Sequence, residues 1–416
     1  MKPTVELLAN QKAGFFMVIL GGPLIIGFLM LWPNMIFHYA EWTQNYMQPF
    51  FFGGVFVAAF FVGLRSVFKF TILGIFLLLF ASNISYVAEK VHFQLFSEGL
   101  LLIFLAAMLY RQPRYIGFAF KVLVFLAVIF SIQTVIVFMA WLIGYRIPVE
   151  CNDFLGYIKF TRGMECSFNL WLGDNGYLRR DWYGFRATGY FTEANRLAYF
   201  QTIPMFLAYH YRKESFYYHA AFYLIIFSIM ATVSVVGMAA AFGAFFLYKN
   251  RNLSRKVKGV LFLLFIVIPT LFIVVSVNPE MFGRILDKSG SFAVRLAGAK
   301  GAMLYLLQNP FGFKLGDAIL SQELMLASGV SIGLFYWIFW GGLVAAGLLL
   351  PILFVYLINM YELVAKGDQF ERMFGYASLA YFMEQSFFGN YFESYFIAVM
   401  AVTLAINRLR ARLAIL

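Results

Sequence analysis

The chain has few charged side chains, and this shortage limits the class of protein that it can be. Only 12% of its 416 residues are charged, whereas 62% are hydrophobic; a soluble domain is about one quarter charged. The mean hydropathy is +0.79, and apolar runs of about 20 residues recur along the chain. These features exclude a soluble globular protein and predict a polytopic helical membrane protein.

The sequence also lacks the motifs by which enzymes bind nucleotides or metals. It contains no P-loop, dinucleotide fingerprint, metal-ligand cluster or nucleophile elbow, and its four histidines are scattered. We therefore expect chemistry that needs no cofactor and no metal. The net charge of +12 is dispersed among loops that flank apolar runs, where membrane topology explains it, so nucleic acid is not an expected partner.

The apolar runs predict about twelve membrane-spanning helices in one domain, 1–416, with an all-α fold. They lie at about 14–33, 48–64, 70–88, 93–110, 115–145, 194–211, 217–232, 233–248, 258–277, 329–361, 373–386 and 391–407. The pairs 217–248 and 373–407 are predicted helical hairpins with tight turns at Thr232 to Gly237 and Phe387 to Tyr391. Glu384 and Glu393 flank the second turn, so we expect them to be open to solvent.

The distribution of Lys and Arg among short loops predicts the orientation of the chain. If the spans alternate, nearly all of the basic short loops fall on one side, and the opposite short loops contain Lys90 alone. Both termini are then cytoplasmic. Two long loops, 146–193 and 279–328, face the other side of the membrane and hold most of the remaining charge.

The only two cysteines, Cys151 and Cys166, both lie in the first long loop. On an oxidising face such a pair favours a disulfide over two free thiols. Closing a loop of about 15 residues would stabilise the fold by roughly 3 kcal/mol. Metal binding is the weaker interpretation, because no histidine or third thiol accompanies the pair.

Six arginines of the two long loops are the candidate ligands for an anionic substrate. Guanidinium groups bind phosphate oxygens in a bidentate manner and stay charged at any pH, which suits a lipid pyrophosphate. The alternative for each arginine is an interaction with lipid headgroups or with local carboxylates. The six are Arg179, Arg180, Arg186, Arg196, Arg284 and Arg295.

Three carboxylates of the same loops are candidate general bases. Glu193, Asp317 and Glu323 could remove the proton of an attacking sugar hydroxyl or align it. Each could equally be an ordinary charge at a helix end. Within the predicted spans, Glu98 is the clearest ionisable group, and it fits either a functional role or structural pairing.

The residues Arg186-x-x-Gly189-x-Phe191-x-x-x-Asn195-x-x-Ala198 carry a resemblance to a known family. This segment resembles the point where the large periplasmic loop of bacterial O-antigen polymerases and ligases enters the next span. The second loop is similar as well, with Ser291-Phe-Ala-Val-Arg295 and then Asn309-Pro310-Phe-Gly312-Phe before a span. Twelve spans, cytoplasmic termini and two large loops match over most of the length.

The resemblance implies a membrane glycosyltransferase of the C type in the bacterial inner membrane. Its substrate would be an oligosaccharide linked to undecaprenyl pyrophosphate, with Arg186 and Arg295 holding the donor pyrophosphate at the periplasmic face. A chain-length regulator protein is a candidate partner. Surface-polysaccharide polymerase is the favoured function.

Two departures from the family bear on this choice. The family often has Ser-Arg-Gly in the turn before its eighth span, whereas this chain reads Thr232-Val-Ser234-Val-Val-Gly237, so one phosphate contact is missing or supplied elsewhere. Ligases carry a histidine late in the second loop, where this chain has Ser321-Gln322-Glu323, which disfavours the ligase. A lipid-linked oligosaccharide flippase is the alternative outside the enzymes, but it would be expected to have short loops.

Overall fold

The structure is a computed structural model of the full chain. It describes residues 4–9, 102–142 except 104, 164–168, 175–181, 184–187, 194–250 except 233, the positions 304, 307, 308 and 310, and then 333–388 and 394–415. The elements in chain order are α1 (Val5–Ala9), α6 (Arg114–Leu142), β1 (Met164–Phe168), β2 (Asn175–Asp181), β3 (Gly184–Ala187), α7 (Ala194–Tyr211), α8 (Phe216–Ala231), α9 (Val235–Lys249), α14 (Gly333–Lys366), α15 (Gln369–Phe388) and α16 (Ser394–Ile415).

The described helices follow the predicted apolar runs. The hairpin predicted at 217–248 is α8 and α9, joined by a turn that includes Thr232 and Ser234. The helices predicted at 194–211 and 329–361 are α7 and α14. A mainly helical fold is therefore confirmed for the described part of the chain, while the remaining spans, the total of about twelve and the C-type architecture stay predictions.

Among the described residues, two helical segments are long and apolar enough to cross a membrane. They are Arg114–Met139 and Gly341–Lys366. Two shorter apolar helices, Phe216–Ala231 and Val236–Lys249, form the hairpin. Large apolar side chains such as Phe216, Phe246 and Phe354 are exposed on the helix surfaces, as expected for helices that face lipid. These features support association with a membrane.

Helix α7 is the centre of the described bundle. It contacts α6, α8, α9 and α15, and most of its side chains from Leu197 to Ala208 are fully buried. Pro204 lies inside this helix and has no N–H to donate to the carbonyl of Phe200, four residues earlier. The hydroxyl of Tyr395 in α16 donates to that carbonyl at 3.4 Å, so a neighbouring helix replaces the missing hydrogen bond.

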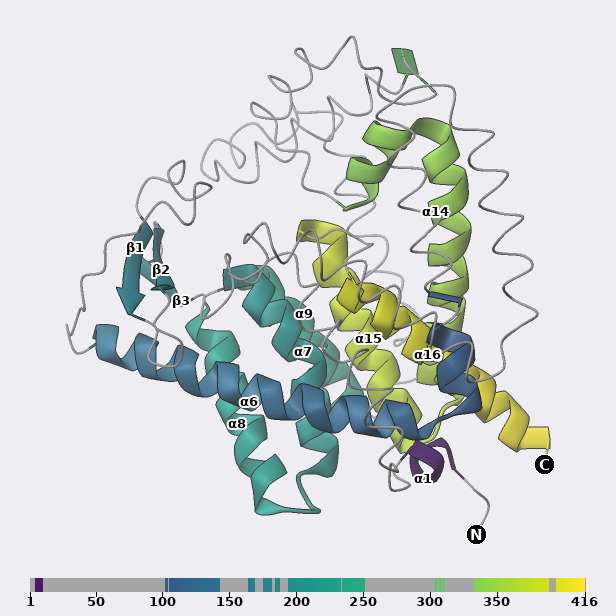
Figure 1. The fold of residues 1–416 in the computed structure, drawn as a ribbon, viewed down its shortest axis with the longest axis horizontal. Helices are drawn as coiled ribbons and strands as arrows, with labels where there is room; N and C mark the ends of the chain where they lie inside the picture. Colours follow the sequence, from purple (N-terminus) through teal and green to yellow (C-terminus); the bar gives the residue numbers. More distant parts are fainter. Residues whose placement is uncertain are drawn as a thin grey trace.

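Helix α6 does not lie parallel to its neighbours. Figure 1 shows it running across α7 and α8, and it contacts both. Its 29 residues make a helix about 44 Å long at 1.5 Å per residue. The hydrocarbon core of a bilayer is about 30 Å thick, so a helix of this length must tilt if it is to stay inside it.

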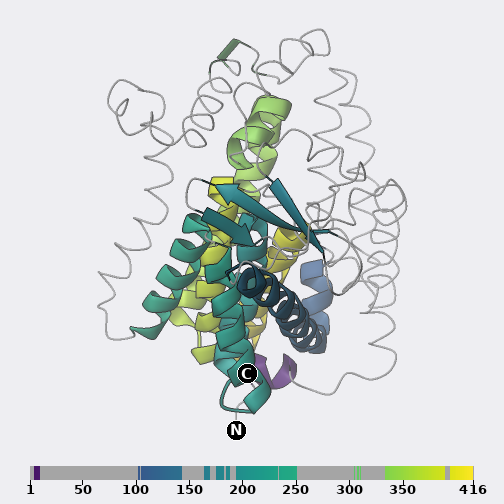
Figure 2. The same ribbon diagram turned by 90° about the vertical axis from the view of Figure 1, so that its left-hand side faces the viewer.

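The first long loop contains a small sheet, which the prediction of an all-α fold did not include. Strands β1, β2 and β3 form an antiparallel meander in that order. The strands have five, seven and four residues, which is short for a period-2 hydrophobic pattern to be visible. Strand β3 contacts α6, and Figure 2 shows the sheet beside one end of that helix.

Helix α14 is interrupted by a glycine near its beginning. Gly342 has φ 62° and ψ −153°, a conformation that residues with a Cβ rarely adopt. The break frees the N–H of Leu343, which donates to the carbonyl of Pro310 at 2.8 Å. Pro310 belongs to the predicted second long loop, so this residue is fixed to the kink of the following helix.

The turn between α14 and α15 is tight and capped. Asp368 accepts a hydrogen bond from the N–H of Glu371 at 2.8 Å, and Glu371 accepts one from the N–H of Asp368 at 2.9 Å. This reciprocal pair is a capping box with Asp at the N-cap. A Cβ at Gly367 would lie 2.3 Å from the carbonyl oxygen of Leu363, so only glycine fits at this position.

Candidate functional site

The candidate site lies where the sheet is followed by the first turns of α7. Only the six residues 188–193 separate β3 from α7, and that connection can span at most about 24 Å. Figure 1 shows the sheet at the opposite end of the bundle from α1 and the end of α16. The sheet therefore lies away from α1 and from the end of α16, while cytoplasmic termini stay a prediction.

Two arginines of the sheet are placed directly opposite each other. Arg179 in β2 pairs with Arg186 in β3, while Arg180 pairs with Phe185. Residues that are opposite in an antiparallel register lie on the same face of the sheet. Arg179 and Arg186 thus share one face, and Arg180 lies on the other.

The first turn of α7 is tied to the turn between α8 and α9. The hydroxyl of Ser234 donates to Oδ1 of Asn195 at 2.8 Å. The same hydroxyl accepts from the N–H of Gly237 at 3.2 Å, so Ser234 is also the N-cap of α9. Ser234 is completely buried, and its hydrogen bond to Asn195 fixes where α7 begins.

One turn further along α7, the backbones of two helices approach closely. A Cβ added to Gly237 would lie 2.7 Å from Cβ of Ala198 and 3.0 Å from Oγ of Ser234. Small residues at helix interfaces allow this kind of approach. Asn195-x-x-Ala198, the end of the family-like motif, therefore packs against Ser234-x-x-Gly237, and its role is to position α7.

The same face of α7 carries Thr202, seven residues after Asn195, which contacts a buried acid. Thr202 Oγ1 lies 2.7 Å from Oε1 of Glu384 in α15 and 3.1 Å from the carbonyl oxygen of Ala198. Glu384 is 0% exposed, and its Oε2 has no hydrogen-bond partner among the described residues. The expectation that Glu384 is open to solvent is wrong. Helix α15 continues to Phe388, and its packing against α7 buries Glu384.

The depth of Glu384 separates it from the sheet arginines. Thr202 is eight residues into α7, which corresponds to about 12 Å along the helix axis. A buried ionisable group in a helical bundle is a functional candidate, but this one lies two turns inside the bundle. We interpret Glu384 as part of the packing that supports the site.

A second face of α7 makes polar contacts that hold the bundle together. Nε2 of Gln201 donates to Oγ of Ser131 in α6 at 3.0 Å and to Oγ of Ser228 in α8 at 2.8 Å. All three side chains are fully buried. Such interhelical hydrogen bonds link helices in an apolar environment, so α6, α7 and α8 form one unit beneath the sheet.

Five of the predicted site residues fall within the described chain. Cys166 lies in β1, Arg179 and Arg180 lie in β2, Arg186 lies in β3, and Arg196 lies in the first turn of α7, where it is partly buried. The structure brings Arg186 together with Arg179 rather than with Arg180. The other predicted site residues lie outside the described residues: Cys151, Glu193, Arg284, Arg295, Asp317 and Glu323.

Three residues of the site end were not singled out as site residues by the sequence. In the sequence, Ser234 marks only a departure from the family, Glu384 is predicted to be open to solvent, and Thr202 belongs to no motif. One signal was available: Asn195, Ala198 and Thr202 are spaced i, i+3 and i+7, which puts them on one face of a helix. A stripe of small and polar residues in an apolar helix predicts a contact with another helix.

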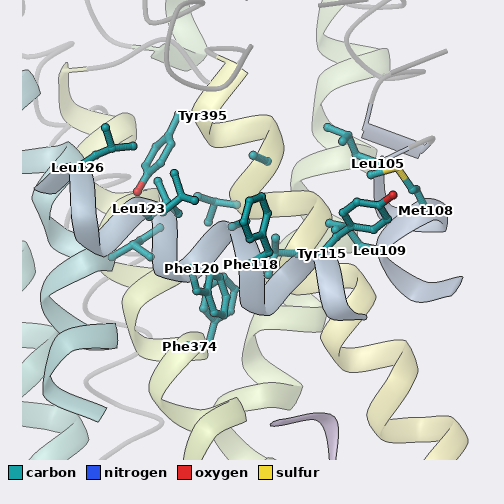
Figure 3. A pocket seen from close by; sticks show the side chains of 16 residues that line it. Leu105, Met108, Leu109, Tyr115, Phe118, Phe120, Leu123, Leu126, Phe374 and Tyr395 are labelled. Carbon is teal, nitrogen blue, oxygen red and sulfur yellow. The ribbon is translucent and has the colours of Figure 1, made fainter. Parts of the chain in front are cut away.

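An apolar cavity lies on the other side of α7, between α6, α15 and α16. Figure 3 shows its walls, to which Tyr115, Phe118, Phe374 and Tyr395 contribute. Its volume is about 60 Å³, whereas a cavity that binds benzene has about 150 Å³. It is therefore too small for an isoprenoid chain, and we assign it to imperfect packing around the crossing helix α6.

Comparison of the chain with protein-family models, with curated proteins and with solved structures finds no match. The resemblance to O-antigen polymerases and ligases therefore depends on the motif residues themselves. For the first motif, the structure supplies a physical role: Asn195 and Ala198 position α7 against α9.

Proposed function

We propose that this protein is a surface-polysaccharide polymerase of the O-antigen type, acting on lipid-linked oligosaccharides at the periplasmic face of the inner membrane. The growing glycan on undecaprenyl pyrophosphate is the donor. The non-reducing end of a fresh lipid-linked repeat unit is the acceptor. The apolar helices Arg114–Met139 and Gly341–Lys366 support the membrane location, and cytoplasmic termini remain part of the proposal.

The observation that supports this function most strongly is the pairing of Arg179 with Arg186 across β2 and β3. Two guanidinium groups on one face of a sheet repel each other and are stabilised by a doubly charged anion between them. A pyrophosphate has this charge. Seven residues separate Arg186 from α7, whose start is fixed by the hydrogen bond from Ser234 to Asn195.

The proposed reaction is a glycosyl transfer in which the pyrophosphate leaves. The acceptor hydroxyl oxygen attacks the anomeric carbon of the donor sugar next to the phosphate, and a new C–O bond forms. The bond from that carbon to the phosphate oxygen breaks, and undecaprenyl pyrophosphate takes the electron pair. The hydroxyl proton passes to a carboxylate, for which Glu193, Asp317 and Glu323 are the candidates. Arginines stabilise the charge that builds on the pyrophosphate.

The placement of charge favours an enzyme over a flippase. A flippase would need charged side chains along a central cavity between its spans, whereas here arginines gather in a sheet that precedes α7. Ligation to lipid A core is the alternative within the enzymes. Ser321-Gln322-Glu323 stands where ligases carry a histidine, so the polymerase is preferred.

The direct test uses the purified full-length protein and synthetic lipid-linked repeat units, with the products separated by chain length. We expect glycans of two or more repeats and release of one undecaprenyl pyrophosphate for each linkage formed. Arg179→Ala together with Arg186→Ala should stop elongation, and Arg180→Ala is the matched control from the other face of the sheet. Elongation at the normal rate by the double variant would exclude the proposed role of this pair.

A further inference from the structure

The opposite end of the bundle contains a polar cavity that the proposed reaction does not use. It has a volume of about 310 Å³ and lies between the ends of α7 and α9 and the start of α15. The residues around it include Tyr209, His210, Arg212, Lys213, Tyr248 and Lys249. Figure 1 shows the turn between α7 and α8 at the same end as α1, far from the sheet.

The cations around this cavity lack acidic partners. Among the described residues, none of Arg212, Lys213 and Lys249 makes an ion pair with a carboxylate, and the ion pairs that form involve His210, Lys366 and Arg410. Glu6 pairs with His210, with 2.8 Å between Oε1 and Nε2. A small cavity with three positive charges and no compensating acid attracts anions.

An aromatic ring holds two of these cations in place. Cζ of Arg212 lies 3.5 Å from the centre of the Tyr209 ring, and Nζ of Lys249 lies 4.7 Å from it. Edge-on contacts with Phe245 at 4.7 Å and Tyr248 at 6.1 Å between ring centres fix this ring. The two charges are therefore positioned before any ligand arrives, which lowers the entropic cost of binding.

His210 lies in the wall of the cavity and contacts α1. Its side chain is 8% exposed, and its Nδ1 is buried without a hydrogen-bond partner among the described residues. Because the Glu6 carboxylate accepts a hydrogen bond, Nε2 carries the proton. His210 therefore contributes to the wall of the cavity, and its contact with Glu6 ties α1 to the end of α7.

The surroundings indicate which anion fits. Tyr211, Tyr217 and Tyr218 lie close to the same turn, with ring centres 5.5 Å apart for Tyr211 and Tyr218 and 5.2 Å for Tyr217 and Tyr218. Tyrosines gather where a membrane meets water. The cavity is thus at the depth of lipid headgroups, and basic pockets between helices at this depth bind phosphate-bearing headgroups.

We propose that this basic cavity, formed by Arg212, Lys213 and Lys249 around Tyr209, is a binding site for the phosphate headgroup of an anionic membrane lipid. The site lies at the end of the bundle away from the sheet arginines, so it is independent of the proposed polymerase activity. A bound headgroup bridges the turn after α7, the end of α9 and the start of α15. Its role is to fix these three ends relative to one another.

The test measures lipid binding by native mass spectrometry of the full-length protein in neutral detergent, titrated with phosphatidylglycerol. Arg212→Gln together with Lys249→Gln should lower the affinity for the first bound lipid about 30-fold, because each charge removed should lower it about fivefold. The matched control, Lys366→Gln with Arg408→Gln, removes the same charge at the same end and should bind normally. If both double variants lower the lipid affinity equally, the assignment of this cavity as the binding site is wrong.

A single variant and two competing probes test the site further. Lys213→Gln changes an exposed residue, so the fold should be unaffected. It should lower the affinity for phosphatidylglycerol about fivefold. Unchanged binding by this variant and by the double variant would overturn the proposal. Phosphatidylcholine and inorganic phosphate are the competing probes. If inorganic phosphate displaces the lipid at equal concentration, the site is one for free anions, and the assignment to a headgroup is wrong.

Discussion

The two ends of α7 both collect arginines and lysines, but they do so in different ways. At the far end, Arg212 and Lys249 lie at helix ends against the ring of Tyr209, and the predicted cytoplasmic location of this end accounts for basic residues there. At the beginning, Arg179 and Arg186 are set opposite each other by strand register, and no topological rule requires that. In the two proposals, the first end binds the donor pyrophosphate and the second binds the headgroup of a membrane lipid.

The beginning of α7 is also the more rigidly defined end. Asn195 and Ala198 meet Ser234 and Gly237 through one hydrogen bond and one close contact. At the far end, the rings of Tyr211 and Tyr218 contact each other in a tilted arrangement, and the turn that follows α7 is exposed. A reaction that transfers a sugar needs fixed geometry, and a small misplacement of its groups is costly. We therefore expect substitutions to have larger effects on function at the beginning of α7.

The largest effect is expected from the sheet arginines. Replacing Arg179 and Arg186 by Ala should reduce chain elongation by at least about 100-fold, because each donor to a developing negative charge is worth about 10²–10³ in rate. Arg180→Ala should retain most of the activity. The measurement is the length distribution of surface glycan in cells that express each variant at equal level. An equal loss in the double variant and in Arg180→Ala would mean that charge alone, and not register, matters.

A smaller effect is expected at the close contact between α7 and α9. Gly237→Ala should destabilise the protein, because overpacking costs about 1–3 kcal/mol and improved helix propensity offsets at most about 1 kcal/mol. Adding Ala198→Gly removes the clashing methyl group and should restore much of the loss. Thermal unfolding in detergent measures both variants. If the two substitutions destabilise the protein additively, Ala198 and Gly237 are not in contact.

The hydrogen bond at the start of α7 should contribute about 1 kcal/mol. Asn195→Ala and Ser234→Ala each remove the 2.8 Å bond, and Ser234→Ala also removes the N-cap of α9, which costs about 1 kcal/mol more. In a double-mutant cycle the two changes should show a coupling of about 1 kcal/mol. Thermal unfolding is again suitable, and independent effects of the two substitutions would show that the bond does not stabilise the fold.

The smallest effect is expected at Glu384. Glu384→Gln keeps the shape of the side chain and an oxygen that accepts from Thr202 at the observed 2.7 Å, so unfolding temperature and chain elongation should both change little. Glu384→Leu leaves Thr202 with only the carbonyl of Ala198 and should lower expression. Loss of elongation in Glu384→Gln at normal protein level would place this acid in the reaction and extend the site two turns into the bundle.

Much of the helical part could be predicted from the sequence, and the reason is local. Runs such as 194–211 and 217–248 are continuous in apolar character and bounded by polar or small residues, and α7, α8 and α9 begin and end within about two residues of those limits. The turn with Thr232 and Ser234 was predicted for the same reason. A helix that is apolar on all sides needs no knowledge of its neighbours to be recognised.

Other features depend on contacts that no local pattern contains. Glu384 was expected in solvent because a turn follows it, but packing of α15 against α7 buries it. The sheet was missed because strands of four to seven residues in a polar loop resemble ordinary loop sequence. The partner of Arg186 was unknown because register sets it: Arg179 and Arg180 are neighbours in sequence, yet only Arg179 is opposite Arg186.

The glycan ladder of cells that lack this protein tests the central proposal most directly. Lipopolysaccharide from the deletion strain would be separated by size and compared with the strain that is complemented by the full-length chain. A polymerase predicts that core carrying a single repeat unit persists while the longer glycans disappear, and that complementation restores them. If only bare core remains, ligation or flipping has been lost instead, and the proposed polymerase function is contradicted.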